Sequence, residues 1–203
     1  MMDFKLPFLI PIRPIKGYFE MKYERRGSMK VGIIIIAAFL LTQVLDWSFS
    51  GFVVNDRRLD EINILWIGVT FLFPFILFAI SNWCVTTLMQ GEGSFKDICM
   101  ATAYALMPIV LIHFPLVFLS NIITLEEAAF YYFFYGFAIF WFGVMLFLGI
   151  MTVHQYTVAK TLGTFILTVL VMAIIVYIML LLFSLGQQIS VFFVTIYEEI
   201  RLR

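Results

Sequence analysis

The feature that most limits the fold is a set of long stretches without any charged side chain. Residues 62–89, 98–120 and 161–197 contain no Asp, Glu, Lys or Arg. A helix that crosses a bilayer needs about 20 mainly apolar residues, so each stretch is long enough to do so. Over all 203 residues the chain is 63% hydrophobic and 13% charged, whereas soluble domains are roughly half apolar and a quarter charged. These observations predict an all-α integral membrane protein.

Polar breaks divide the apolar sequence into five predicted transmembrane helices. The predicted spans are 29–46, 62–89, 98–120, 128–151 and 161–183. The resulting domain organisation is a cytosolic arm with an amphipathic helix (1–28), a five-helix membrane domain (29–184) and an interfacial C-terminal segment (185–203).

Both ends of the chain have the pattern of interfacial amphipathic helices. Before residue 14, Pro7 and Pro11 are expected to break any helix. Helical spacing of apolar residues then predicts a helix over Pro14–Arg26, either lying on the inner membrane surface or packed on the protein's own inner loops. At the other end, residues 186–188 (GQQ) are expected to interrupt the last apolar run. A second interfacial helix should follow, with a re-entrant segment as the alternative.

The distribution of basic residues predicts the orientation. If the N-terminus is cytosolic, nine of the 13 Lys and Arg residues lie on the inner side of a five-span protein. Cytosolic loops are enriched in Lys and Arg, so the predicted topology is N-in/C-out.

The segment 82–108 contains a short polar turn between two apolar runs, GEGSFKD at residues 91–97. It lacks the Lys-Ser/Thr of a phosphate-binding loop, and no strand precedes it. We interpret it as a helix junction in which Gly91 ends one helix, Ser94 caps the next, and Asp97 lies in the first turn.

On the predicted inner side, this turn and the loop HQYTVAK (154–160) bring together the charged residues outside the arm. The candidate partner-docking residues are Glu92, Lys96, Asp97, His154 and Lys160. For His154 the alternative interpretation is a hydrogen-bonding residue at the membrane interface.

His113 is the candidate polar residue inside a span. Ionisable groups within the membrane often serve function, but a proton or ion relay needs a partner. The interiors of the other predicted spans supply no acid or base for this role. The alternative is a neutral imidazole bonded to a carbonyl that Pro115 leaves free. Small residues at helical spacing, Ala101 with Ala105 and Gly136 with Gly143, predict close helix packing within the chain or with a partner.

No motif predicts catalysis, a cofactor or a metal site. The chain lacks a Ser-His-Asp arrangement in a plausible setting, a His-Glu-x-x-His motif and paired intramembrane aspartates. The two histidines and two cysteines do not have metal-ligand spacing. A formal net charge of zero gives no indication of nucleic-acid binding.

Several segments resemble the Yip1 family of five-span membrane proteins. They are PIKGYF (14–19), KYERRGS (22–28), NWCVTTLMQGEGSFKDICMATAYALMP (82–108), LEEA (125–128) and GIMTVHQY (149–156). The chain is most similar to the compact bacterial branch. Its short arm departs from eukaryotic members, whose longer cytosolic arms interact with small GTPases of vesicle transport.

The resemblance implies a non-enzymatic protein of the bacterial plasma membrane. Bacterial relatives are often encoded beside sugar ABC transporters, so the implied role is an accessory or scaffold subunit of a carbohydrate ABC importer, in contact with its permease subunits and with membrane lipids. Two alternatives are a small oligomeric transporter or channel, and a lipid-interacting protein that shapes the membrane. The family brings no catalytic residues to assign.

Overall fold

A computed structural model describes residues 5–55 and 63–201, which form helices and no strands. Arg57, Arg58 and Arg203, which the orientation argument counts, lie outside the described residues. The helices are α1 (Leu6–Ile12), α2 (Pro14–Lys22), α3 (Met29–Phe49), α4 (Ile64–Leu88), α5 (Phe95–Ala105), α6 (Met107–Leu119), α7 (Ala128–His154) and α8 (Val158–Arg201).

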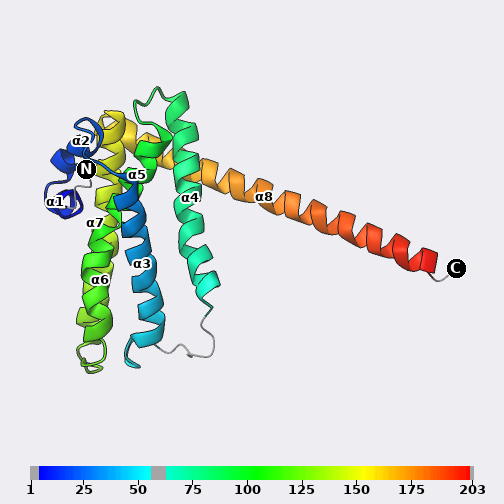
Figure 1. Ribbon diagram of the computed structural model, residues 1–203, viewed down its shortest axis with the longest axis horizontal. Coiled ribbons are helices and arrows are strands. Elements are labelled where there is room, and N and C mark those ends of the chain that lie inside the picture. Colours follow the sequence, from blue (N-terminus) through cyan, green and yellow to red (C-terminus); the bar gives the residue numbers. More distant parts are fainter. Residues whose placement is uncertain (1–4, 56–62, 202–203) are drawn as a thin grey trace.

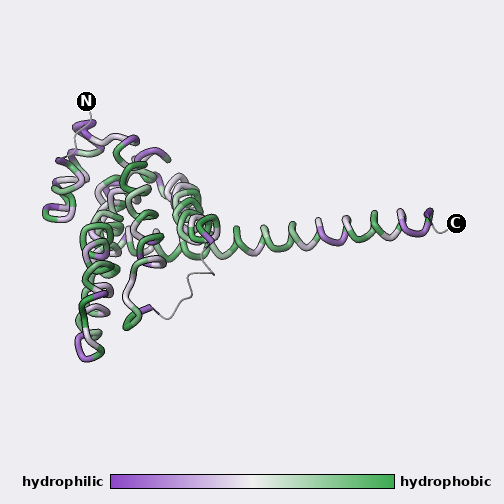
Figure 2. Tube along the Cα trace, turned by 60° about the horizontal axis from the view of Figure 1, so that its bottom comes forward, coloured by the Kyte–Doolittle hydropathy of each residue, from purple (hydrophilic) through white to green (hydrophobic). Residues whose placement is uncertain are grey.

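Five of the described helical segments are long and apolar enough to cross a membrane. They are α3, α4, α5 with α6, α7 and α8, which confirms the predicted all-α class and the five spans. Figure 1 shows α3, α4, α6 and α7 running side by side, with α1 and α2 at the end where α3 begins. We call this the arm end, and the opposite end the far end. In Figure 2 apolar residues predominate along the bundle helices, and polar ones gather at the N-terminal arm and the turns.

The third span is broken in its middle. The α-helix α5 ends at Ala105, and the Leu106 N–H bonds back to Ala103 O at 3.2 Å, three residues earlier. Pro108 then occupies the first turn of α6, where its missing N–H costs nothing. The same proline would have removed a bond from a continuous helix, which explains why the break falls here.

The arm packs on the bundle. Helix α2 begins at Pro14 as predicted, and Tyr18 is buried against α7. Gly149 makes this contact possible, because a Cβ there would lie 2.9 Å from Tyr18 Cζ. One face of this helix therefore packs on the protein. Helix α2 also keeps apolar side chains exposed at Ile15 and Phe19.

The prolines do not prevent an early helix, so that expectation is wrong. Helix α1 has Pro7 in its first turn and Pro11 inside. In a helix of 7 residues the first four N–H groups have no helical partner. Pro7 therefore removes no hydrogen bond, and Pro11 removes one. Burial of Leu6 and Ile10 in the core offsets that loss.

The last helix is continuous, which corrects the predicted interruption at 186–188. Helix α8 has 44 residues and passes through Gly186 without a break. A glycine inside a helix costs only about 1 kcal/mol relative to alanine, and glutamine favours helix. Figure 1 shows α8 leaving the bundle near the arm end at a steep angle.

Candidate functional site

The predicted helix junction between α4 and α5 is confirmed in outline. Ser94 caps α5 in a capping box: its Oγ accepts from the Asp97 N–H at 3.3 Å, and the Asp97 carboxylate accepts from the Ser94 N–H at 3.0 Å. Helix α4 ends at Leu88, and the left-handed residue after it is Gln90, with φ 56°, instead of Gly91. The Gly91 N–H returns to Thr86 O at 2.8 Å.

The two glycines of this turn are needed for space, since neither has a positive φ. Gly91 lies directly over His154, and a Cβ there would overlap the imidazole and come within 2.7 Å of the Tyr156 hydroxyl. A Cβ on Gly93 would lie 2.6 Å from Val153 Cγ1. The turn therefore packs against the end of α7 so closely that neither position has room for a side chain.

His154 is the main contact of the α4–α5 turn with the end of α7. It is buried, and its Nδ1 accepts a hydrogen bond from the Gly93 N–H at 3.2 Å. Its ring stacks on Tyr156 with centroids 5.2 Å apart. The Tyr156 hydroxyl lies 3.3 Å from Met89 O and donates toward the end of α4. Burial raises the pKa of this hydroxyl above its ordinary value, which is already well above neutral pH.

The arm completes this contact. Tyr23 donates to the Glu92 carboxylate at 3.1 Å and accepts from the Gln155 side chain at 2.8 Å. Lys22 Nζ donates to Val153 O at 2.5 Å. The arm, the α4–α5 turn and the end of α7 thus form one hydrogen-bonded assembly at the arm end, which we call the turn assembly.

The structure brings the candidate docking residues to the same end but gives them different environments. Glu92 and Lys96 are exposed, Asp97 is held in the capping box, and His154 is buried beneath the turn. Lys160 lies over the Tyr156 ring, with Nζ 4.0 Å from its centroid.

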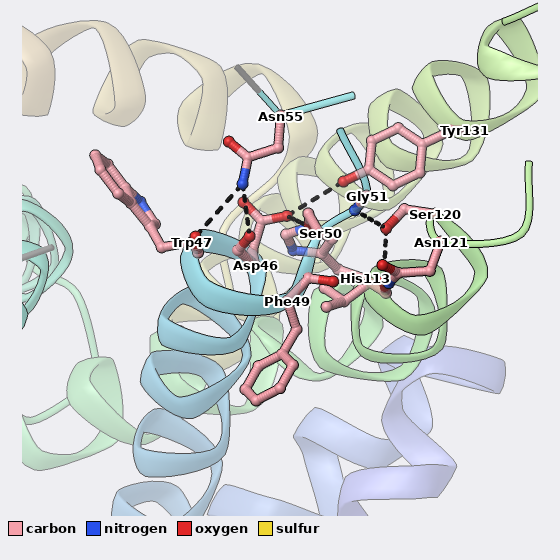
Figure 3. Close-up of polar contacts among 11 residues, drawn as sticks. Asp46, Trp47, Phe49, Ser50, Gly51, Asn55, His113, Ser120, Asn121 and Tyr131 are labelled. Atoms are coloured by element: carbon pink, nitrogen blue, oxygen red, sulfur yellow. Dashed lines mark hydrogen bonds and ion pairs between the residues drawn. The ribbon is translucent and has the colours of Figure 1, made fainter. Parts of the chain in front are cut away.

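His113 has an acidic partner, contrary to the expectation from the sequence. Its Nε2 lies 3.3 Å from Asp46 Oδ1 at the far end of the bundle. The same oxygen accepts from Ser50 Oγ at 2.8 Å and from the Tyr131 hydroxyl at 3.2 Å (Figure 3). We call Asp46, Ser50, His113 and Tyr131 the aspartate cluster.

Asp46 was not predicted as a partner of His113 because the predicted first span ends at that residue. Helix α3 continues to Phe49, so Asp46 stays within the helix and faces α6 and α7. The available signal was the spacing of Asp46 and Ser50, four residues apart and hence on one helix face.

Backbone contacts close the same end. The Gly51 N–H donates to Ser120 Oγ at 2.8 Å, and Asn121 donates to Phe49 O at 2.7 Å (Figure 3). A cavity of about 140 Å³ lies beside the cluster and is lined in part by Asp46, His113 and three tyrosines. Within the described ranges, no group of three His, Cys, Asp or Glu side chains could hold a metal ion.

The fold and its two polar assemblies define a polytopic α-helical membrane protein with an arm folded against the α4–α5 turn and the end of α7. The family model described as Yip1 domain matches residues 8–192, from the arm into α8. The chain therefore belongs to the Yip1 family, as the sequence resemblance indicated. This is a membrane protein family not known for enzymatic activity. Searches of curated proteins and of solved structures found no match.

Proposed function

We propose that this protein is a non-enzymatic accessory or scaffold subunit that associates laterally with other membrane proteins through α8. The observation behind the proposal is the exposure of that helix. Every residue from Tyr177 to Arg201 is exposed, and most are apolar up to Tyr197. At 1.5 Å per residue α8 is about 66 Å long, roughly twice the hydrocarbon core of a bilayer. Large exposed apolar surfaces mark contacts with lipid or with a partner protein.

The base of α8 is firmly attached, which would make it a stable platform. Thr161, Thr164 and Thr168 are its buried residues, and Asn82 of α4 donates to Thr168 Oγ1 at 3.2 Å. Phe165 packs between Phe78 and Phe147, with centroids 5.8 and 5.6 Å away. From Tyr177 to Arg201 the helix has no cover in the described part of the chain.

Two of the four small residues singled out in the sequence support lateral association. Ala101 and Ala105 of α5 are buried within the chain, as their spacing predicted. A Cβ on Gly136 or Gly143 would meet no described atom within 4 Å. These two glycines therefore serve no close packing among the described residues and are available to a neighbouring helix.

The partner we propose is the pair of membrane subunits of a carbohydrate ABC importer in a bacterial plasma membrane, with the N-terminus cytosolic. The partner rests on the resemblance to bacterial Yip1 proteins, and the orientation on the distribution of Lys and Arg. In this proposal the docking residues at the arm end form a second contact. Glu92, Lys96 and Lys160 would face the partner, while Asp97 and His154 hold the turn.

A photo-crosslinking residue at Leu181 or Leu185 should link the protein to an importer permease when both are expressed in one membrane. The matched control is Leu65, an exposed leucine of α4, which should give little permease product. Mass spectrometry identifies the product. Recovery of the protein alone from both α8 positions would contradict lateral association through α8.

The second contact, at the arm end, is tested by charge reversal. Glu92→Lys should lower the amount of permease recovered with the protein. Glu24→Lys is the control, since Glu24 is also exposed at the arm end.

The Asp46–His113 pair favours a second candidate function, a small transporter or channel. A buried imidazole beside a carboxylate is an arrangement that proton relays use. If the protein moves protons or sugar in liposomes, His113→Ala should reduce the flux at least tenfold, and the conservative His113→Gln should not restore it. Equal flux in empty and protein-containing liposomes would exclude this function.

A further inference from the structure

The arm and the start of α5 enclose a basic groove at the arm end. It has a volume of about 450 Å³ and is lined by Met21, Lys22, Arg25, Gly27, Lys96, Asp97 and Met100. Three of these residues are basic and one is acidic. Residues 21–27 come from the arm, whereas 96–100 come from α5, so the groove exists only because the arm is folded on the bundle.

Three acids near this groove are already engaged, and a fourth, Glu24, is exposed and does not line it. Glu20 pairs with Arg26 and with Lys16, and Glu92 accepts from Tyr23. The Asp97 carboxylate accepts from Ser94 N–H at 3.0 Å and Ser94 Oγ at 2.7 Å, at the start of α5.

Two of the three bases are left without such a partner. Among the described residues, Arg25 and Lys96 form no ion pair or side-chain hydrogen bond, and both are exposed. Lys22 donates to Val153 O and keeps its charge at the groove wall. The groove therefore presents an excess of positive charge with two free donor groups.

The turn that carries Arg25 holds it at the groove. Arg25 has φ 53°, so the chain reverses there, and the N–H groups of Arg26 and Gly27 bond back to Glu20 O and Met21 O. Gly27 fits closely, since a Cβ there would lie 2.8 Å from Met21 O. The left-handed conformation disfavours arginine relative to glycine or asparagine, which allows a neutral replacement that keeps the turn.

The groove lies at the level where a membrane surface is expected. Two apolar helices long enough to span begin beside it, at Met29 and Phe95, and a third ends at His154. Phe95, next to Lys96, is exposed, as are Ile15 and Phe19 on α2. Exposed apolar side chains beside free bases match the boundary between acyl chains and headgroups.

From this arrangement we propose that the groove binds the phosphate of an anionic phospholipid headgroup in the leaflet at the arm end. Arg25 and Lys96 contact the phosphate, and Lys22 adds charge from the side. The exposed apolar residues of α2 and Phe95 pack on the acyl chains. This inference does not depend on the proposed protein partner. Lys96 belongs to both proposals, so Glu92 in the docking test and Arg25 in the lipid test are the positions that separate them.

The test is native mass spectrometry of the full chain in detergent with an equal mixture of phosphatidylglycerol and phosphatidylcholine of identical acyl chains. We expect preferential retention of phosphatidylglycerol. Each base near a membrane surface contributes about fivefold in affinity for anionic lipid. Arg25→Asn and Lys96→Gln should therefore each weaken phosphatidylglycerol binding about fivefold. Lys30→Gln is the matched control, an exposed base at the arm end that does not line the groove.

Equal retention of the two lipids would overturn the proposal, as would binding by Arg25→Asn and Lys96→Gln that equals binding by Lys30→Gln. If free glycerol phosphate binds with the same dependence on Arg25 while phosphatidylglycerol does not, the ligand is a soluble phosphate and the lipid assignment is wrong. Circular dichroism of each variant checks that helix content is retained, so that a loss of binding reports on the groove.

Discussion

Replacing Gly91 with alanine is expected to destabilise the folded protein by about 2–3 kcal/mol, the cost typical of forcing an atom into a packed site. The added methyl group would overlap the His154 ring and lie 2.7 Å from the Tyr156 hydroxyl. Either the turn or the end of α7 must move, and the hydrogen bond from Gly93 to His154 is lost with that movement. Thermal unfolding in detergent should show a clear fall in Tm.

Gly68→Ala is the matched control, because a Cβ there meets nothing within 4 Å and alanine favours helix. It should leave Tm unchanged or raise it slightly. In a His154→Ala background, Gly91→Ala should cost less than in the native protein, since removal of the imidazole makes room. A Tm for Gly91→Ala equal to that of Gly68→Ala would show that the turn does not rest on His154.

Asp46→Ala is expected to cost about 2–3 kcal/mol, because it leaves the groups around its carboxylate without an acceptor, including those of the buried His113 and Tyr131. Ser50, His113 and Tyr131 all face the lost carboxylate, and they belong to three different helical segments. The loss should separate the far ends of α3, α6 and α7. Asp46→Asn should cost less, since its side-chain oxygen can still accept from Tyr131 or Ser50.

Ser48→Ala serves as the control for this position. Among the described residues Ser48 Oγ bonds only to Val44 O of its own helix, so its removal should change stability by a few tenths of a kcal/mol. Thermal unfolding and hydrogen exchange near residue 113 are the measurements. If Asp46→Ala and Ser48→Ala unfold at the same temperature, the aspartate cluster does not stabilise the fold.

Local chemistry predicted the helix junction between α4 and α5 well. Ser94 followed three residues later by Asp97 is a capping box within the sequence itself, and the structure contains it. The reason for Gly91 was different from the expected one. The left-handed conformation falls on Gln90, and Gly91 is needed because His154, 63 positions later in the sequence, lies against it. No local pattern contains that contact.

In the arm too, local sequence predicted the helix and tertiary contacts decided its position. Helical spacing in α2 indicated an amphipathic helix and left two places for its apolar face. Burial of Tyr18 on Gly149 places one face of the helix on the protein, and that contact joins residues far apart in the sequence. The basic groove follows from this docking alone, because its bases come from both sides of the contact.

The sequence by itself determined that this is an all-α membrane protein with five apolar helical segments, and it identified the Yip1 family. The reason is that a bilayer leaves backbone groups no partner except those within a helix, so hydropathy along the chain is enough to locate the spans. Only the tertiary structure decided that Asp46 contacts His113, that Gly93 contacts His154, and that Arg25 and Lys96 line one groove. Those meetings depend on how each helix is rotated and where it ends, which is set by packing between segments distant in the sequence.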